Sequence, residues 1–205
     1  LINPSRTRGG RQVRDGSEAC KPSALAVLER ERRARPHAEV VHVHIRTHEL
    51  ELAAEGDKLV LVHANRRVVL ERVAPDRFIV KHPDFDTFVL GFVRENQQVT
   101  QAFHGANWYL GAKYNGPKTF ETKKDWEAFV GHYHNDSPWY GDARVVYRKG
   151  RLYLDGLQPL VDRGDGKFGI GDPEAPDWIA FESIIDGRAM RLNFSGILFR
   201  RMSTP

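Results

Sequence analysis

From residue 37 to the C-terminus, the chain consists of short runs in which hydrophobic and polar residues alternate, separated by segments with turn-forming residues. In one of the first runs, Val41, Val43 and Ile45 alternate with His42 and His44. A period of two is typical of a β-strand that buries one face and leaves the other polar. Many short runs of this kind predict an antiparallel β-barrel or β-sandwich.

The C-terminal part of the chain shows these runs most clearly. The dipeptides Lys149-Gly150, Asp165-Gly166 and Asp186-Gly187 mark tight turns between them, because glycine adopts the positive φ that such turns require. A similar set of eight strands can be drawn through residues 40–110, with less sharp borders. In the C-terminal part we expect eight strands near residues 129–134, 142–148, 151–154, 158–163, 167–170, 177–182, 188–194 and 197–202.

The same landmarks occur twice, at a spacing that stays near 90 residues. The turn and strand at Glu55–Leu61 are matched by Arg148–Leu154, and His104-Gly105 is matched by Ser195-Gly196. Such a constant spacing indicates an internal duplication. We therefore expect an all-β chain with two tandem small antiparallel β-barrels of about eight short strands each. The expected boundaries are 37–115 for the first barrel and 116–205 for the second, with a break at Asn115-Gly116-Pro117 and a short helical entry near Lys123–Glu127.

The basic charge of the chain is concentrated before the first barrel. Residues 1–36 contain nine Lys or Arg and four Asp or Glu, a net charge of +5, and the whole chain has +4, so the remainder carries about −1. We expect residues 1–36 to be a flexible basic tail or linker, with a short helix over 24–32 that ends before Pro36. Since the barrels are close to neutral, nucleic acid is not an expected partner.

Other features of the sequence exclude several kinds of site and of protein. The single cysteine, Cys20, excludes an internal disulfide and a multi-cysteine zinc site. No run of eighteen or more apolar residues occurs, and the N-terminus lacks the layout of a signal peptide, so no membrane span is expected. Because the chain begins with Leu1 rather than methionine, we expect it to have been cut from a longer polypeptide or trimmed.

A candidate metal motif lies at the start of the first expected barrel. His42, His44, Glu49 and Gly56 form the run H-x-H-x4-E-x6-G, which is similar to the first signature of the cupins, a family of metal-binding barrels. Pro36 stands where that signature has glycine, and its second part is not found downstream. One reading is therefore a cupin-like barrel with one transition metal, completed by His82 or His104; the other is the polar face of a half-buried strand.

A second resemblance covers roughly residues 70–205. In the first copy it rests on Asp76–Asp86 and Gln101–Tyr109. In the second copy it rests on Val130–Tyr133, Ser137–Gly141, Arg144–Leu152 and Phe168–Asp172. These segments resemble the C-terminal region of bacterial serine hydrolases of the beta-lactamase and penicillin-binding-protein type. The resemblance implies one or two lipocalin-like barrels that follow a catalytic domain, in the bacterial cytoplasm or periplasm.

The catalytic residues of that family are not found in this chain. Its nucleophile belongs to a Ser-x-x-Lys pair, in which the lysine helps to deprotonate the serine, and no such pair occurs here. Tyr133-His134-Asn135 matches the family's Tyr-x-Asn element by spacing, but it lies in an expected barrel strand. We therefore expect no catalysis by this chain alone and no cofactor.

The resulting prediction is a non-catalytic accessory module. It would pack on or cap a serine-hydrolase catalytic domain, in cis or in trans, and tune access of substrate. A lipocalin-like barrel that binds a small apolar ligand is a further alternative, because an eight-stranded barrel can enclose one such molecule. The residues expected to contact a ligand or a neighbouring domain are His82, Asp84, Phe85, Trp108, Trp139 and Tyr140.

Overall fold

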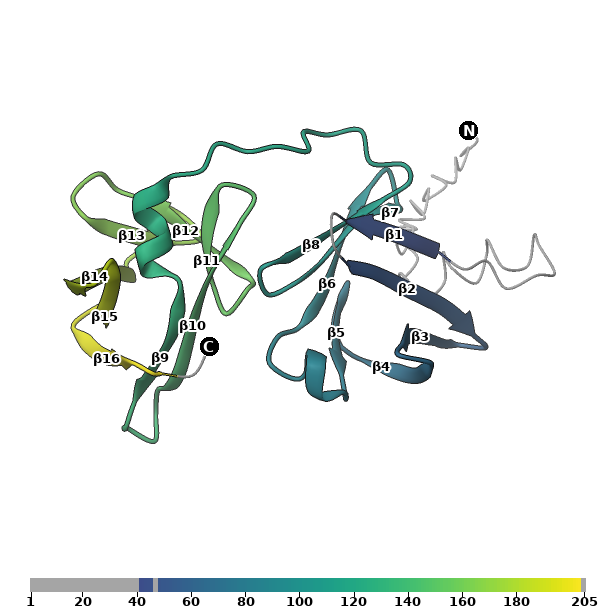
Figure 1. The fold of residues 1–205 in the computed structure, drawn as a ribbon, viewed down its shortest axis with the longest axis horizontal. Coiled ribbons are helices and arrows are strands. Elements are labelled where there is room, and N and C mark those ends of the chain that lie inside the picture. Colours follow the sequence, from purple (N-terminus) through teal and green to yellow (C-terminus); the bar gives the residue numbers. More distant parts are fainter. Residues whose placement is uncertain (1–40, 46–47, 204–205) are drawn as a thin grey trace, which may run out of the picture.

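The computed structural model describes residues 41–45 and 48–203, and for 41–45 and 48–49 it describes the backbone alone. The described part contains sixteen β-strands and two short 3-10 helices, which confirms the predicted all-β class. Figure 1 shows two curled sheets side by side, connected by the segment 112–123. The predicted basic tail 1–36, with its helix over 24–32, lies outside the described residues.

The first barrel is built from eight antiparallel strands in sequential order. Strands β2 to β8 form a curled sheet, and β1 pairs with both β2 and β8, placing Val43 opposite Gly111 and closing the ring. The strands are β1 (Val41–Ile45), β2 (His48–Glu55), β3 (Lys58–His63), β4 (Arg66–Ala74), β5 (Arg77–Val80), β6 (Leu90–Glu95), β7 (Gln98–His104) and β8 (Asn107–Gly111), with the 3-10 helix η1 (Pro83–Phe85) between β5 and β6.

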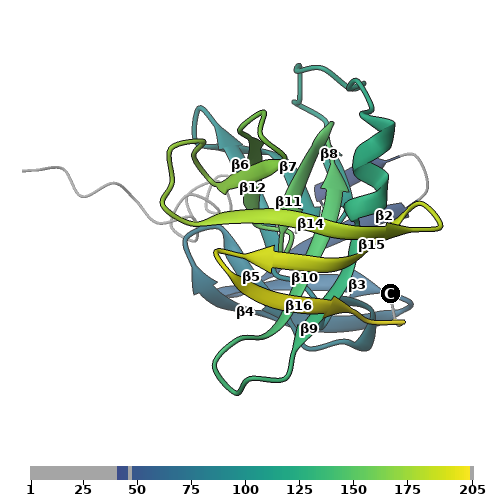
Figure 2. The ribbon, with the colours of Figure 1, turned by 90° about the vertical axis from the view of Figure 1, so that its left-hand side faces the viewer.

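The second barrel repeats this order and is closed by the pairing of β16 with β9, in which Arg201 lies opposite Tyr133. Figure 2 faces this barrel and shows β14, β15 and β16 running next to one another across it. It is preceded by the 3-10 helix η2 (Lys124–Phe129) and consists of β9 (Gly131–Asn135), β10 (Gly141–Arg148), β11 (Arg151–Leu154), β12 (Gln158–Asp162), β13 (Lys167–Ile170), β14 (Trp178–Ile185), β15 (Arg188–Phe194) and β16 (Ile197–Arg201).

The matched landmarks of the sequence occupy equivalent turns in the two barrels. Gly56 lies between β2 and β3, and Gly150 lies between β10 and β11; both adopt a positive φ, of 64° and 74°. Gly105 and Gly196 likewise sit in the turns before the last strand of each barrel. The two halves therefore share one strand order, which is the arrangement that a duplicated sequence predicts.

Large side chains fill the interior of each barrel. In the first, the buried cluster is formed by Leu50, Leu52, Leu61, Leu70, Phe78, Val80, Phe85, Leu90, Phe92, Ala102 and Tyr109. In the second, it is formed by Tyr133, Ala143, Val145, Leu152, Leu154, Leu160, Phe168, Ile179, Leu192 and Phe199. Removal of these side chains from water is the main favourable contribution to the stability of both barrels.

The helix η2 covers one end of the second barrel. The ring of Phe129 stacks on Phe181 at 4.3 Å between centroids, and Trp126 meets Phe168 edge to face at 5.3 Å. Arg201 holds the helix against the barrel by donating hydrogen bonds to the carbonyls of Ala128 and Val130. This end of the barrel is therefore closed by aromatic side chains, with the cation of β16 satisfying the last carbonyls of the helix.

The two barrels are joined through one buried arginine, Arg148, at the end of β10. Its guanidinium donates hydrogen bonds to the carbonyl of Gly105 in the first barrel at 2.5 Å and to that of Gly156 in the second at 3.0 Å. The same group lies over the ring of Phe103 at 4.3 Å and over that of Tyr153 at 4.1 Å. We call these five residues the Arg148 joint.

Two glycines allow the barrels to approach so closely at the Arg148 joint. A Cβ atom on Gly156 would lie 3.1 Å from the Cα of Gly105 and 3.2 Å from the ring of Phe88. A Cβ atom on Gly105 would lie 2.6 Å from the same ring. The backbones of the two turns thus meet without intervening side chains, a close approach for which glycine is the suitable residue.

Replacement of Gly156 with alanine should weaken this contact. Alanine at the positive φ of 69° costs about 1–2 kcal/mol on its own, and overpacking against Gly105 should add about 1–3 kcal/mol. The matched control is Gly164→Ala, because Gly164 has a φ of 81° and no atom within 4 Å of an added Cβ. Urea denaturation should show a clearly larger loss of stability for Gly156→Ala. Equal losses for the two variants would contradict the close contact between the barrels.

Candidate functional site

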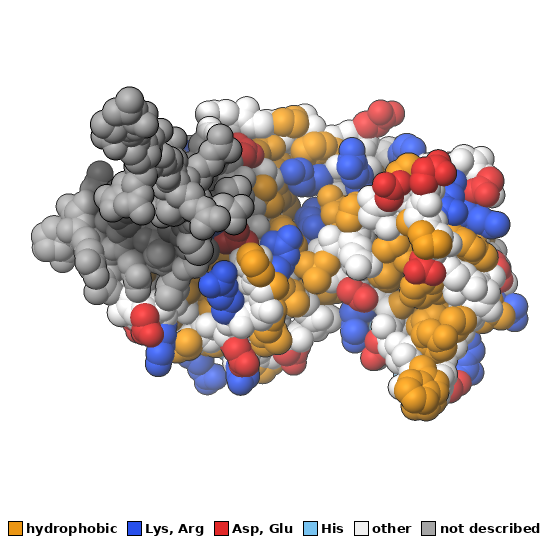
Figure 3. Space-filling model, turned by 180° about the vertical axis from the view of Figure 1, so that it is seen from behind, with side chains coloured by type: hydrophobic (Ala, Val, Ile, Leu, Met, Phe, Trp, Pro, Cys, Tyr) orange, Lys and Arg blue, Asp and Glu red, His pale blue; other side chains and the backbone are white. Residues whose placement is uncertain are grey.

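The loop between β9 and β10 carries the most exposed large aromatic residue of the described part of the chain. Trp139 is 87% exposed and Tyr140 is 47% exposed. Figure 3 shows hydrophobic side chains projecting from the lower end of the second barrel. Because tryptophan and tyrosine are enriched at protein interfaces, this pair marks a candidate contact surface.

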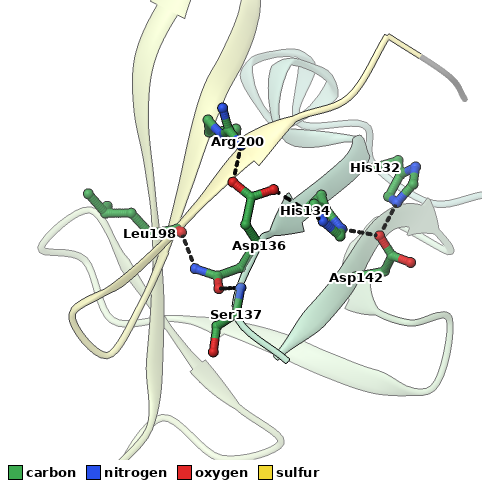
Figure 4. A network of polar contacts seen from close by, with 8 residues as sticks. His132, His134, Asp136, Ser137, Asp142, Leu198 and Arg200 are labelled. Carbon is green, nitrogen blue, oxygen red and sulfur yellow. Dashed lines mark hydrogen bonds and ion pairs between the residues drawn. The ribbon is translucent and has the colours of Figure 1, made fainter. Parts of the chain in front are cut away.

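Side-chain hydrogen bonds hold this loop against β16. Asn135 donates from Nδ2 to the carbonyl of Leu198 at 2.7 Å, and its Oδ1 accepts from the backbone N–H of Ser137 at 2.8 Å. Asp136 forms an ion pair with Arg200, as Figure 4 shows. Asparagine and aspartate at these positions stabilise the turn by bonding to nearby backbone and side-chain groups, so the loop has a fixed base.

The ring of Tyr140 adds a contact with the barrel, because it meets Phe199 of β16 edge to face at 6.3 Å. Phe199 is buried in the core of the second barrel, whereas Trp139 points out of it. The two neighbouring aromatic residues therefore have different roles. Tyr140 anchors the loop, and Trp139 is the side chain that the loop presents to solvent.

A carboxylate with two histidine partners lies next to this loop on the outer face of the barrel (Figure 4). Asp142 accepts hydrogen bonds at Oδ1 from Nε2 of His132 at 2.7 Å and from Nδ1 of His134 at 2.9 Å. These bonds lower the pKa of Asp142, and the one from His132 has the largest effect. Nε2 of His134 also lies 3.5 Å from Oδ1 of Asp136, so the network links β9 and β10 to the loop.

Three of the predicted contact residues come together at one end of the first barrel. His82 caps η1, while Asp84 and Phe85 belong to it. They meet His63, the last residue of β3: Nε2 of His63 lies 2.8 Å from Oδ2 of Asp84, and its ring lies 5.1 Å from that of Phe85. His104, the last residue of β7, packs on Phe85 from the inside at 4.9 Å.

His104 is a structural part of this group. It is buried, and burial lowers its pKa below the ordinary value of 6.5, so the ring is neutral at pH 7. Its Nε2 lies 3.2 Å from the carbonyl of Phe85 and donates a hydrogen bond to it. The ring therefore holds η1 in place from within the barrel.

Trp108 lies apart from both groups, near the Arg148 joint. Its Nε1 donates to Oε1 of Gln101 at 2.9 Å, and the ammonium group of Lys149 from the second barrel lies 4.6 Å from the centre of its ring. The ring of Phe120, in the connecting segment, meets it edge to face at 5.5 Å. Trp108 thus contributes to the contact between the two barrels and the segment that joins them.

The residues of the candidate metal motif lie on β1 and β2. The strand register places His44 opposite Glu49 and His42 opposite Glu51. The side chains of His42, His44 and Glu49 lie outside the described part of the chain. The metal reading of this motif therefore stays a prediction.

Three structural features were not predicted from the sequence: the position of His63 beside Asp84, the two-histidine pairing of Asp142, and the buried Arg148. The alternation of β9 was a usable signal for the second, because His132 and His134 flank the buried Tyr133 and must face outward together. No comparable local signal exists for His63 or Arg148, since both contact residues far away in the sequence.

The chain matches no protein-family model, no curated protein and no solved structure with which it was compared. Within residues 41–45 and 48–203, no helix has the length and apolar character needed to cross a membrane.

Replacement of Asp142 with asparagine tests the network beside the loop. The variant should be less stable than the parent at pH 7 by up to about 1 kcal/mol, a modest loss because the pair is partly exposed and screened by water. A carboxylate whose pKa is lowered in the folded state contributes stability above its unfolded pKa, near 3.8, and loses it as the pH falls through the lower folded value. The difference between parent and variant should therefore shrink below about pH 4.

Urea denaturation between pH 7 and pH 3 measures this difference. Asp165→Asn is the matched control. The one described hydrogen bond of the Asp165 side chain is accepted from the backbone N–H of Lys167, and asparagine can accept the same bond. A difference for Asp142→Asn that stays constant down to pH 3 would rule out the charged network.

Proposed function

We propose that this chain is a non-catalytic accessory module of two lipocalin-like barrels that binds a serine-hydrolase catalytic domain, in cis or in trans, through the loop between β9 and β10. The observation that carries the proposal is Trp139, which is 87% exposed on a loop whose base is held by hydrogen bonds and an ion pair. The class of partner comes from the resemblance of residues 70–205 to the C-terminal region of such hydrolases.

An exposed tryptophan on a fixed base has the properties of an interface anchor. Tryptophan is enriched among the few residues that dominate binding energy, and burial of such an anchor typically contributes about 2 kcal/mol or more. Because Asn135 and Asp136 already hold the loop, little conformational freedom is lost when a partner covers it. Arg200 and Asp136 beside the tryptophan supply polar groups of the kind found at the rim of interfaces.

The state of Tyr133 supports a non-catalytic role. A tyrosine that acts as a base must reach substrate and lose its proton near neutral pH. Tyr133 is fully buried, its hydroxyl donates to the carbonyl of Phe129 at 2.8 Å, and burial raises its pKa to about 12. Together with the lack of a Ser-x-x-Lys pair in the sequence, this favours a structural explanation for the Tyr-x-Asn spacing.

The arrangement of the barrels also suits an accessory role. The Arg148 joint holds the two barrels together, so a partner bound at the loop is positioned relative to the first barrel as well. A loop on a rigid support can reach over a neighbouring active site and limit access of water or large substrates. On this proposal the module tunes access of substrate to the hydrolase and leaves the chemistry to it.

Replacement of Trp139 with alanine should separate binding from folding. The free energy of unfolding should change by less than about 0.5 kcal/mol, because the side chain is exposed. The affinity for the catalytic domain should fall at least about tenfold, since a lost anchor costs roughly 2 kcal/mol. Isothermal titration calorimetry with a purified catalytic domain of the beta-lactamase type, encoded upstream of Leu1 or elsewhere in the same genome, measures this loss.

Trp139→Phe should recover part of the affinity, because phenylalanine keeps an aromatic anchor of smaller area. Ile185→Ala is the matched control: Ile185 is also an exposed hydrophobic residue, at 57%, but it is the last residue of β14. Equal affinities for the parent, Trp139→Ala and Ile185→Ala would reject the loop as the contact surface. Absence of binding by the parent chain would reject the hydrolase as the partner.

A further inference from the structure

At one end of the first barrel, three side chains with metal-binding atoms converge. His63 ends β3, His82 precedes η1, and Asp84 lies within it. Their ligand atoms all lie within 4.8 Å of one another, and within the described residues no other group of three such side chains meets this condition. We propose that His63, His82 and Asp84 bind one divalent first-row transition-metal ion, such as Zn²⁺ or Fe²⁺.

The distances suit a single ion. Zinc binds imidazole nitrogen and carboxylate oxygen at about 2.0–2.2 Å, so two ligand atoms on a tetrahedral ion lie about 3.4 Å apart. Oδ2 of Asp84 lies 2.8 Å from Nε2 of His63 and 3.8 Å from Nδ1 of His82. The two observed distances bracket the required value. The third distance, between the two imidazole nitrogens, lies within 4.8 Å, so the two rings would move closer together around an ion.

The Nδ1 atom of His82 needs no deprotonation to bind a metal, and an ion would replace the hydrogen bond that this nitrogen now accepts. It accepts a hydrogen bond from the backbone N–H of Asp84, at the long distance of 3.3 Å, so this nitrogen carries a lone pair and no proton. Nε2 of His63 now donates to the carboxylate of Asp84 at 2.8 Å. An ion would take the place of that shared proton, because metal binding at histidine releases a proton when the nitrogen carries one.

The surroundings position the ligands and leave a path for the ion. The side chain of His82 is 12% exposed and that of His63 is 34% exposed, whereas that of Asp84 is 61% exposed. The two imidazole rings meet edge to face at 5.1 Å, and Phe85 packs against both of them. The rings are therefore held from the barrel side, and the carboxylate closes the site from the solvent side.

The ligand types select the class of metal. Imidazole favours zinc, iron, copper and nickel, whereas magnesium and calcium prefer oxygen ligands alone. Two histidines and one carboxylate supply three ligands, which leaves at least one coordination position for water or another small molecule. This site differs from the cupin-like motif of His42, His44 and Glu49, and its existence does not depend on the binding loop of the second barrel.

The test is metal binding by the complete chain. After dialysis against Zn²⁺, elemental analysis should find one ion per chain, and isothermal titration should give a single site. The affinity should fall at least about tenfold in His63→Gln, His82→Gln and Asp84→Asn, because each change removes one ligand. With Co²⁺ in place of Zn²⁺, the visible absorption of the parent should change in the same variants.

Two matched control variants test whether the ion binds at this site and not at the other histidines. His134→Gln removes an imidazole from the other group of two histidines and a carboxylate, and His42→Gln/His44→Gln removes the cupin-like pair. Both should keep the ion and the cobalt spectrum. Loss of the ion in the His42/His44 variant alone, or in His134→Gln alone, would overturn the assignment, and so would an absence of binding by the parent chain.

Folding is monitored separately from binding. Asp84→Asn is the most informative variant, because Asp84 is the most exposed of the three ligands and asparagine keeps an oxygen that can accept from His63. The melting temperature of the parent should rise with added Zn²⁺, and that of folded Asp84→Asn should rise clearly less at the same concentration. An equal rise for both proteins would contradict the proposed ligand set.

Discussion

The arrangement of the two barrels depends on one buried cation. The guanidinium of Arg148, a residue that is only 6% exposed, is removed from water, which is costly for a charged group and lowers its pKa. Its compensation comes from two backbone carbonyls, one from each barrel, and from the faces of Phe103 and Tyr153. Both carbonyls belong to positive-φ glycines, and an added Cβ atom at either position would press on Phe88, so glycine at 105 and 156 favours this interaction.

This joint relates the two candidate surfaces to one another. In Figures 1 and 2, the segment that connects the barrels runs across the top of the molecule, and the loop between β9 and β10 lies at the bottom. The turn between β5 and β6, which contains η1, lies at the lower end of the first barrel in Figure 1. Because the Arg148 joint fixes one barrel against the other, the loop between β9 and β10 and the turn that contains η1 are presented at the same end.

The strands of the second barrel could be predicted because the residues in the turns between them are typical turn formers. Lys149-Gly150 and Asp186-Gly187 form the positive-φ turns that their sequence favours, and the strands beside them begin where expected. The largest difference is at the end of β14, expected at residue 182 and observed at Ile185. Ser183 has a φ of 57°, which interrupts the strand conformation. Pairing resumes at Ile184, which lies opposite Ala189, so the strand continues beyond the residues that alternate between hydrophobic and polar.

The candidate sites divide according to how local their contacts are. Trp139 and Tyr140, or His82, Asp84 and Phe85, are neighbours in the chain, so a short motif identifies each group. His63 meets Asp84 from 21 residues away, and Arg148 meets Gly105 from 43 residues away. An arginine beside a turn is normally solvent-exposed, and only the closure of both barrels buries this one. The residues that organise this molecule are therefore those whose environment is created by the fold.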